Sequence, residues 1–302
     1  MKEPFGDSVR FKDIGARLRA YRLGKELTPD ELAGKLGISR AALYRAEKGE
    51  IRKIDMLTSI ADELGVSLAS LMGVGVEYVS TAIAFFERMR QLEEHCQQII
   101  GLFSPVSYLL TSDNYDAVLR EVLRESVPEG IEAEGTSAKA VDGLLEILQA
   151  RKKAFNANRP LIVSLIASAD LERFLLHGLI GRLDLPADIV DFRRRHARAE
   201  AEFILSMLRS QPIGIQIGIV REPVPATSFQ IFRQADRSML AISPFRLGEQ
   251  PNIRLGVALI TSAPEAMDLH EGIAERLWGE ALKGGEAASY LEAMIKKYAI
   301  RT

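Results

Sequence analysis

Residues 27–50 read LTPDELAGKLGISRAALYRAEKGE, and this stretch decides the fold of the N-terminal quarter of the chain. Thr28 and Glu31 have the spacing of a capping box, in which each side chain bonds the backbone N–H of the other residue, and a proline occupies the first helical position. A tight turn at Gly37 leads to a second helix, for which Ser39 is the expected cap. The sequence therefore predicts two short helices joined by a turn.

Helical spacing of apolar residues continues on both sides of this stretch, from Asp13 to Met72. Glycines interrupt the spacing at positions where a helix can end in the left-handed conformation. These glycines are Gly24, Gly37, Gly49, Gly65 and Gly73. Five short helices fit between them, so we predict a five-helix domain over residues 9–73.

The stretch 27–50 resembles the helix-turn-helix of the XRE group, the Cro and lambda-repressor type. Its Leu-Ala, Gly-x-Ser and Glu-x-Gly pairs stand at the spacing of that group, and residues 60–72, IADELGVSLASLM, are similar to the group's last two helices. The resemblance covers about 60 residues, near a fifth of the chain. It implies that the partner of this domain is a double-stranded DNA operator.

The resemblance also implies that the helix from Ser39 to Lys48 enters the major groove. Helical geometry independently selects one outward face of that helix, opposite the core-facing Leu43 and Ala46. On that face an arginine can bond guanine O6 and N7, an alanine can touch a thymine methyl, and flanking cations can attract phosphate. The candidate DNA-binding residues are Thr28, Ser39, Arg40, Ala41, Tyr44, Arg45, Lys48, Arg52 and Lys53. Simple solvation of the surface Arg and Lys side chains is the alternative.

Three positions bear on how far the family's pattern carries over. Pro29 stands where the family often has a Gln that clamps the recognition helix and the DNA backbone, and a proline has no donor for that contact. Glu47 and Arg22 match a buried pair of the family, which implies a structural role. Removing one partner of such a pair costs about 3–5 kcal/mol because it leaves a buried charge alone.

The charge of the chain is unevenly distributed. From Val9 to Lys53 there are twelve Lys or Arg and six Asp or Glu, so this segment is net +6 and the remainder of the chain, whose total is −2, is net −8. A basic module on an acidic body is the pattern expected when one end of a protein binds phosphates.

The next segment, residues 76–103, is predicted to be a linker and dimerisation helix. No Gly or Pro interrupts it from Val76 to Ile100, and apolar residues recur at heptad spacing. In a parallel dimer Arg88 of one chain would face Glu93 of the other. The expected dimer interface consists of Phe85, Met89, Leu92, Cys96 and Ile99. The alternative is that the helix packs within its own chain, because its apolar face is wider than a two-stranded seam needs.

Residues 104–302 change to a mixed pattern, which predicts an α/β layered domain for effector sensing or oligomerisation. The expected helices are 113–125, 138–156, 168–179, 186–209 and a last one ending near 282; the expected strands are 160–167, 213–220, 227–232, 238–242 and 253–259. This order resembles half of a phospholipase D-like domain, whose catalytic His-x-Lys is absent here. The predicted fold class is thus α plus α/β: a five-helix domain, a long linker helix and an α/β layered domain.

Motifs for catalysis are absent from the sequence. It has no phosphate loop, no dinucleotide fingerprint, no Gly-x-Ser-x-Gly and no Cys/His zinc spacing, so we expect no enzymatic activity, no cofactor and no metal. Cations in the acidic C-terminal part are candidates for binding an anionic effector, with a solvated helix face as the alternative. They are Arg194, Arg198, Arg221 and Arg233.

Localisation follows from what the chain lacks. Its apolar runs are shorter than the ~18 residues of a membrane span, its N-terminus has no apolar signal region, and its single cysteine cannot form an intrachain disulfide. We therefore expect a cytoplasmic protein without membrane contact.

These features together predict a homodimeric, sequence-specific transcriptional regulator whose C-terminal domain senses a small molecule. Two alternatives belong to other classes: an enzyme fused to a DNA-binding module, and an adaptor whose C-terminal domain binds another protein.

Overall fold

The computed structural model describes residues 11–51, 53–127 and 138–298. Its first part is the predicted five-helix domain, with α1 (Phe11–Gly24), α2 (Pro29–Lys35), α3 (Arg40–Glu47), α4 (Ile54–Leu64) and α5 (Leu68–Met72). The capping box at Thr28 and the cap at Ser39 are both formed. One prediction about the helix ends is wrong, because after α1 the left-handed conformation is taken by Glu26, at φ 55°, and not by Gly24.

The second part is an α/β domain, which begins directly after the helices. Its elements are β1 (Val76–Val79), α6 (Ala82–Glu93), β2 (Cys96–Phe103), a 3-10 turn (Tyr108–Leu110), α7 (Tyr115–Glu125), α8 (Ala138–Asn158), β3 (Leu161–Ala167), α9 (Ser168–His177), α10 (Ala187–Ser210), β4 (Ile215–Val220), β5 (Ser228–Gln234), β6 (Ser238–Ser243), β7 (Ala258–Thr261), α11 (Pro264–Glu280), β8 (Leu282–Lys283) and α12 (Gly284–Lys297).

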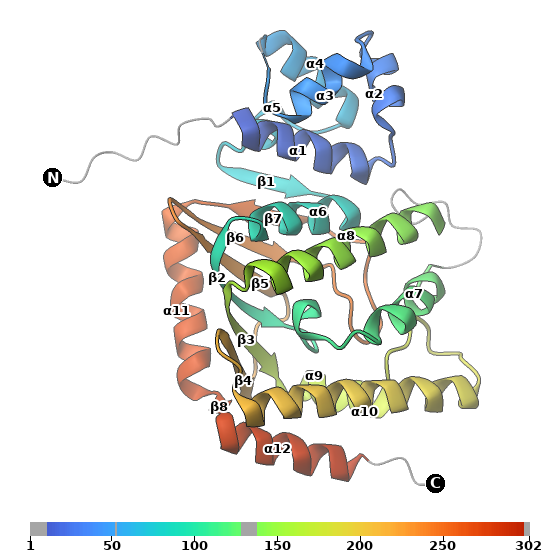
Figure 1. The fold of residues 1–302 in the computed structure, drawn as a ribbon, viewed down its shortest axis with the longest axis vertical. Coiled ribbons are helices and arrows are strands. Elements are labelled where there is room, and N and C mark those ends of the chain that lie inside the picture. The colour runs from blue at the N-terminus through green and yellow to red at the C-terminus, as the bar shows by residue number, and fades with distance from the viewer. Residues whose placement is uncertain (1–10, 52, 128–137, 299–302) are drawn as a thin grey trace, which may run out of the picture.

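The strands form one mixed sheet in the order β1-β7-β6-β5-β2-β3-β4-β8. Strands β2, β3 and β4 are parallel neighbours, and the other pairs are antiparallel. Helix α11 packs on one face of this sheet, whereas α6, α8, α9, α10 and α12 contribute to the core on the other (Figure 1). The α/β domain is therefore a helix–sheet–helix layered structure, as its strand and helix pattern predicts.

The long linker helix is a wrong prediction. Helix α6 ends at Glu93, and the residues after it form β2, which pairs with β3 on one side and β5 on the other. Strand β1 also belongs to the sheet, because it pairs with β7. Residues 76–103 are thus part of the α/β domain and not a separate linker.

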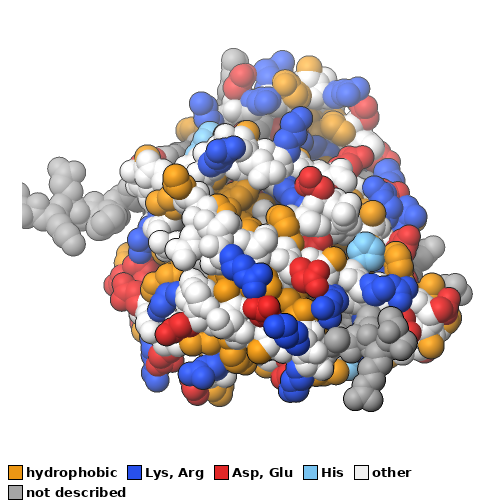
Figure 2. Space-filling model, turned by 60° about the horizontal axis from the view of Figure 1, so that its bottom comes forward, with side chains coloured by type: hydrophobic (Ala, Val, Ile, Leu, Met, Phe, Trp, Pro, Cys, Tyr) orange, Lys and Arg blue, Asp and Glu red, His pale blue; other side chains and the backbone are white. Residues whose placement is uncertain are grey.

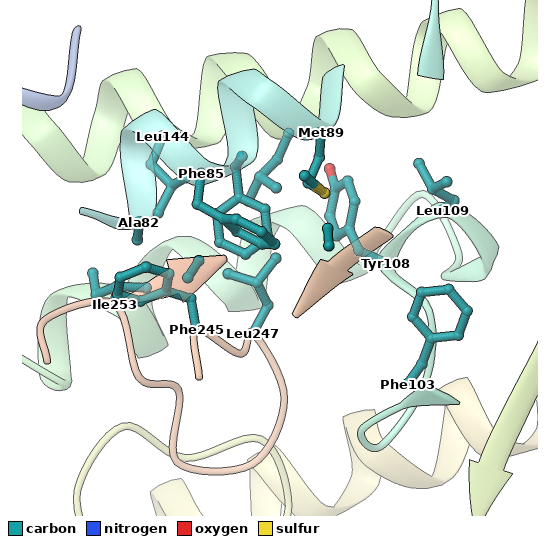
Figure 3. Close-up of a cluster of buried hydrophobic side chains, with 14 of the residues drawn as sticks. Ala82, Phe85, Met89, Phe103, Tyr108, Leu109, Leu144, Phe245, Leu247 and Ile253 are labelled. Carbon is teal, nitrogen blue, oxygen red and sulfur yellow. The ribbon is translucent and has the colours of Figure 1, made fainter. Parts of the chain in front are cut away.

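The predicted dimer seam is wrong for the same reason. Phe85 and Met89 lie inside a single chain, in a cluster with Leu144 of α8 and Phe245 from the loop after β6 (Figure 3). All five residues expected at the interface are at most 9% exposed: Phe85, Met89, Leu92, Cys96 and Ile99. The alternative given for these residues, that they pack within their own chain, is therefore correct.

The charges expected to pair across that seam are also satisfied within one chain. Arg88 binds Glu77 of β1, and Glu93 accepts hydrogen bonds from Arg151 of α8 at 2.9 and 2.5 Å. Burial raises the pKa of the Cys96 thiol to about 11, and its Sγ donates to the carbonyl of Gln98, so this cysteine is a protonated core residue at neutral pH.

The remaining differences from the predicted C-terminal pattern are small. Strand β7 begins at Ala258, later than expected, and α12 was not predicted, although Ala287, Leu291 and Ile295 recur every four residues on its buried side. Within the ranges that the structure describes, no helix is long and apolar enough to cross a membrane.

Candidate nucleic-acid interface

Helix α3 presents one face to the core and the opposite face to solvent. Leu43 and Ala46 are fully buried, whereas the four residues expected to read bases are exposed: Arg40, Ala41, Tyr44 and Arg45. The Ser39 hydroxyl accepts a hydrogen bond from the backbone N–H of Ala42 and so fixes the start of the helix. The predicted reading face is therefore a continuous outward surface of α3.

Two exposed side chains on this surface interact with each other. The Tyr44 ring is 60% exposed, and the Lys48 ammonium lies 5.5 Å from its centroid. An exposed aromatic ring beside a cation suits contact with a base or with the DNA backbone. Arg40 is within 3.3 Å of Asp30, but both side chains are more than 60% exposed, so this ion pair is solvated and easily exchanged.

The cations of the basic segment fall into two groups. Arg17 and Arg22 are buried in ion pairs, and Lys35 pairs with Glu63 at 2.8 Å. Arg45 and Lys53 have no ion pair in the part of the chain that the structure describes. Part of the positive charge in the sequence is thus structural, and the exposed cations without an ion pair in the described ranges include Arg45 on α3 and Lys53 at the start of α4. Arg52, another predicted contact, lies outside the described residues.

The buried pair expected from the motif is present. Arg22 Nε donates to Glu47 Oε1 at 2.6 Å, Arg22 Nη2 donates to Glu47 Oε2 at 3.3 Å, and Arg22 Nη1 reaches the carbonyl of Leu27 at 2.8 Å. These bonds connect α1, the loop before α2 and the last residue of α3. The pair therefore holds α3 in place, as its structural role requires.

Thr28 is less available than the motif suggests. Its hydroxyl donates to Glu31 Oε2 at 2.7 Å and accepts from the Glu31 backbone N–H, and its own N–H also bonds Glu31. The Glu31 carboxylate consequently lies at the start of α2, beside Pro29. An anion beside this helix start disfavours a phosphate there.

The five-helix domain rests on the α/β domain through a buried carboxylate, that of Glu77 in β1. Arg17 of α1 donates to Glu77 Oε2 at 3.0 Å, and Arg88 of α6 donates to Glu77 Oε1 at 2.7 Å and to Oε2 at 3.1 Å. All three residues are at most 5% exposed. Because one carboxylate holds an arginine from each domain, the domains are fixed to one another by a desolvated ion cluster.

Further contacts extend this junction along α1. The Tyr21 hydroxyl donates to the carbonyl of Tyr78, Asp13 pairs with Arg237, and Arg19 lies 3.5 Å from Glu87 of α6. At the end of α1, a Cβ on Gly24 would lie 2.5 Å from Thr81 Oγ1 and 2.9 Å from the Ala84 Cβ. The approach of α1 to α6 therefore requires a glycine there. Sequence reasoning missed these residues; a glutamate within an apolar strand was the available signal.

The predicted effector cations are not brought together. Arg194 and Arg198 lie on α10, where they approach Asp191 and Glu202, whereas Arg233 of β5 binds Gln98 and, at 3.0 Å, Glu271 of α11. Helices α10 and α11 pack on opposite faces of the sheet.

Arg221 lines a pocket beside α11, together with Glu222, Arg276 and Glu280. On the face seen in Figure 2, Lys and Arg side chains are interspersed with Asp and Glu. Because Arg194 and Arg198 lie on one side of the sheet and Arg221 and Arg233 lie near α11 on the other, the four arginines do not form a common anion site. Among the residues described, no group of three or more His, Cys, Asp or Glu side chains is placed to hold a metal ion.

Comparison with known proteins agrees with the geometry of the first domain. Residues 13–71 match the family model of a helix-turn-helix domain, which spans α1 to within α5. The N-terminal part of the chain is therefore a helix-turn-helix domain. A search of curated proteins finds no match.

Two of the solved structures that match the chain are apo forms of a competence regulator. One is the apo form of the competence regulator ComR from Streptococcus vestibularis, with 18% identity, 66% of this chain and 50% of that chain covered, and a TM-score of 0.20. The other is the apo form of ComR from S. thermophilus, with 16% identity, coverages of 66% and 51%, and a TM-score of 0.19. The chain spans about half the length of these structures, and TM-scores this low do not define the fold of the α/β domain.

Proposed function

We propose that this protein is a sequence-specific DNA-binding transcriptional regulator of the XRE group. The observation that carries the proposal is the exposed face of α3, where Arg40, Tyr44 and Arg45 project from a helix that Ser39 caps and the Arg22–Glu47 pair holds in place. In helix-turn-helix proteins such a face lies in the major groove, and arginine reads guanine there.

The acting form that we propose is a cytoplasmic homodimer. Helix-turn-helix domains of this type read two half-sites about one DNA turn apart, and a two-fold axis supplies the second reading helix. The dimer surface lies outside the residues first expected, because Phe85, Met89 and Leu92 fill the core of one chain.

The α/β domain is proposed to sense a small molecule. It is far larger than dimerisation requires, and its β1 and α6 hold the helix-turn-helix domain through Glu77 and Arg88. An effector that favours one arrangement of this junction would change the population of DNA-competent molecules. The likeness of the strand order to half of a phospholipase D-like domain is part of this proposal as a fold only, without phosphodiesterase activity.

The test is recovery of genomic DNA fragments bound by the full chain. The double variant Arg40→Ala/Arg45→Ala removes the reading arginines, and Arg209→Ala/Arg276→Ala removes two exposed cations of the α/β domain as the matched control. We expect a shared motif with two-fold symmetry for the unaltered chain and the control, and no motif for the α3 variant. Fragments without a motif, or a motif that survives the α3 variant, would refute the proposal.

A further inference from the structure

A pocket of about 400 Å³ lies at the junction of the two domains, and we name it the junction pocket. The helix-turn-helix domain contributes Leu23 and Leu27 from the corner between α1 and α2, α6 contributes Ile83, and α8 contributes Ile147. Its size and its largely apolar walls are those of small-molecule sites in proteins. A molecule bound there would touch both domains at once.

One corner of the junction pocket is polar and carries two guanidinium groups on a single carboxylate. The Glu87 side chain is 1% exposed; it accepts hydrogen bonds from Arg90 at 2.8 and 2.9 Å, and the Arg19 Nε lies 3.5 Å from it. Arg19 is half exposed, and its distance from Glu87 is long for a hydrogen bond. Arg19 therefore has donors available for a second anion, next to a site that is shielded from water.

Of the other charged residues of the junction pocket, Arg22 is buried and already paired with Glu47. Lys139 and Glu146 on α8 are exposed and of opposite sign, and Glu26 is half-buried in the loop after α1. Lys139 and Glu146 largely offset each other, whereas the corner in which Arg19 and Arg90 flank the buried Glu87 carries one net positive charge and determines which charge the bound molecule carries. That corner favours a carboxylate.

The α8 wall has a glycine where the helix itself does not need one. A Cβ on Gly143 would meet no atom within 4 Å, in contrast to Gly24 at the same junction, whose Cβ would touch α6. Glycine inside a helix costs about 1 kcal/mol relative to alanine. Gly143 lines the junction pocket and leaves space that a large side chain would fill.

We infer that the junction pocket binds a small amphipathic carboxylate, with its carboxylate on Arg19 and its apolar body between the α1–α2 corner and α8. The regulatory consequence rests on the function proposed above: a ligand held by both domains favours one arrangement of α1 on α6 and so changes DNA affinity. The chemical class of the ligand follows from the pocket alone.

Calorimetric titration of the full chain with octanoate and with decanoate tests the ligand class, and 1-octanol is the uncharged match. We expect saturable binding of one carboxylate per chain and binding of 1-octanol that is at least about ten-fold weaker. No saturable binding of either carboxylate, or equal affinity for octanoate and 1-octanol, would overturn the inference.

Two pairs of variants test the place of binding. In the first pair, Gly143→Leu fills the junction pocket and Gly143→Ala is its control. In the second pair, Arg19→Gln removes the cation proposed to bind the carboxylate, and Arg209→Gln, on α10, is its control. We expect the first member of each pair to weaken octanoate binding at least about ten-fold and the control to stay within about two-fold. Undiminished binding in Gly143→Leu would place the site elsewhere and refute the inference.

A DNA measurement separates this inference from the proposed function. Retention of sheared genomic DNA by the full chain is measured with and without octanoate. If octanoate binds in the junction pocket but no DNA is retained under either condition, the inference about the ligand is supported and the proposed regulatory function is refuted. If DNA is retained and octanoate does not bind, the proposed function is supported and the inference about the ligand is refuted.

Discussion

At the scale of single residues, the structure distinguishes cations that hold the fold from cations that face solvent. Arg17 is buried against Glu77, whereas Lys53 is exposed and has no ion pair within the described ranges. The sequence alone counts both as positive charge. Only the burial of each side chain separates a structural arginine from one that can meet a phosphate.

Lys53→Ala should weaken binding to all DNA sequences about equally. Lys53 lies just before α4 and contributes attraction to phosphate without reading bases, so the variant should lower the salt dependence of binding by about one phosphate contact. Fluorescence anisotropy with a recovered fragment and its scrambled copy, at several salt concentrations, measures this. Lys296→Ala on α12 is the control, and a loss confined to the recovered fragment would contradict the assignment.

Glu47→Gln should lower the free energy of unfolding by about 3–5 kcal/mol, because it leaves the buried Arg22 without its anion. Urea unfolding followed by circular dichroism measures the change. The control is Glu63→Gln, which breaks the partly exposed pair with Lys35 and should cost less than about 1 kcal/mol. Equal losses in the two variants would show that the Arg22–Glu47 pair is not structural.

At the scale of elements, the helices and strands with several local signals were predictable, and those decided by distant contacts were not. Thr28 and Ser39 predicted the starts of α2 and α3 because capping is local. The segment after Glu93 was wrongly predicted to be helical, because Ile99 and Phe103, four residues apart, share one face in a helix and also in a strand. Pairing with β3 and β5, far away in the sequence, makes it the strand β2.

Leu92→Asp should destabilise the single chain and not merely separate a dimer. Leu92 is 2% exposed in the core beneath α6, and an aspartate there loses apolar contacts and buries a charge, so the loss should exceed about 3 kcal/mol. Thermal unfolding together with sedimentation measures both effects, with Leu92→Met as the control. If Leu92→Asp instead gave a folded monomer of normal stability, Leu92 would belong to a dimer interface and not to the core.

Asp13→Asn should lower the melting temperature near pH 7 and have progressively less effect in acid. Burial raises the pKa of Asp13, but the hydrogen bond and charge of Arg237 outweigh it and hold the pKa below its usual 3.8. A carboxyl with a lowered folded pKa stabilises the fold above its unfolded pKa, and this contribution is lost as the pH falls through the folded value.

Melting curves of both proteins from pH 7 down to about pH 3 test this, and the difference between them should shrink below about pH 4. Asp62→Asn is the control, since Asp62 is exposed and has no ion pair among the described residues. A difference in melting temperature that stays constant with pH would show that the Asp13–Arg237 pair does not stabilise the junction.

At the scale of the whole molecule, the outward face of α3 was predictable and the junction between the two domains was not. The outward face of α3 follows from helical periodicity within eight residues, Arg40–Glu47. The junction depends on contacts between residues distant in sequence, such as Arg17 with Glu77, and on a pocket shared by α1, α6 and α8. The mixed sheet likewise places the predicted effector arginines on different sides, which no local pattern contains.

Selection from a randomised duplex pool by the full chain and by Arg45→Ala tests whether α3 reads DNA sequence. We expect the unaltered chain to enrich one motif and Arg45→Ala to lose preference at a single base position in each half-site, with a cost of about 1–3 kcal/mol on the original motif. The same motif at the same affinity with both proteins, or no enriched motif with either, would contradict it.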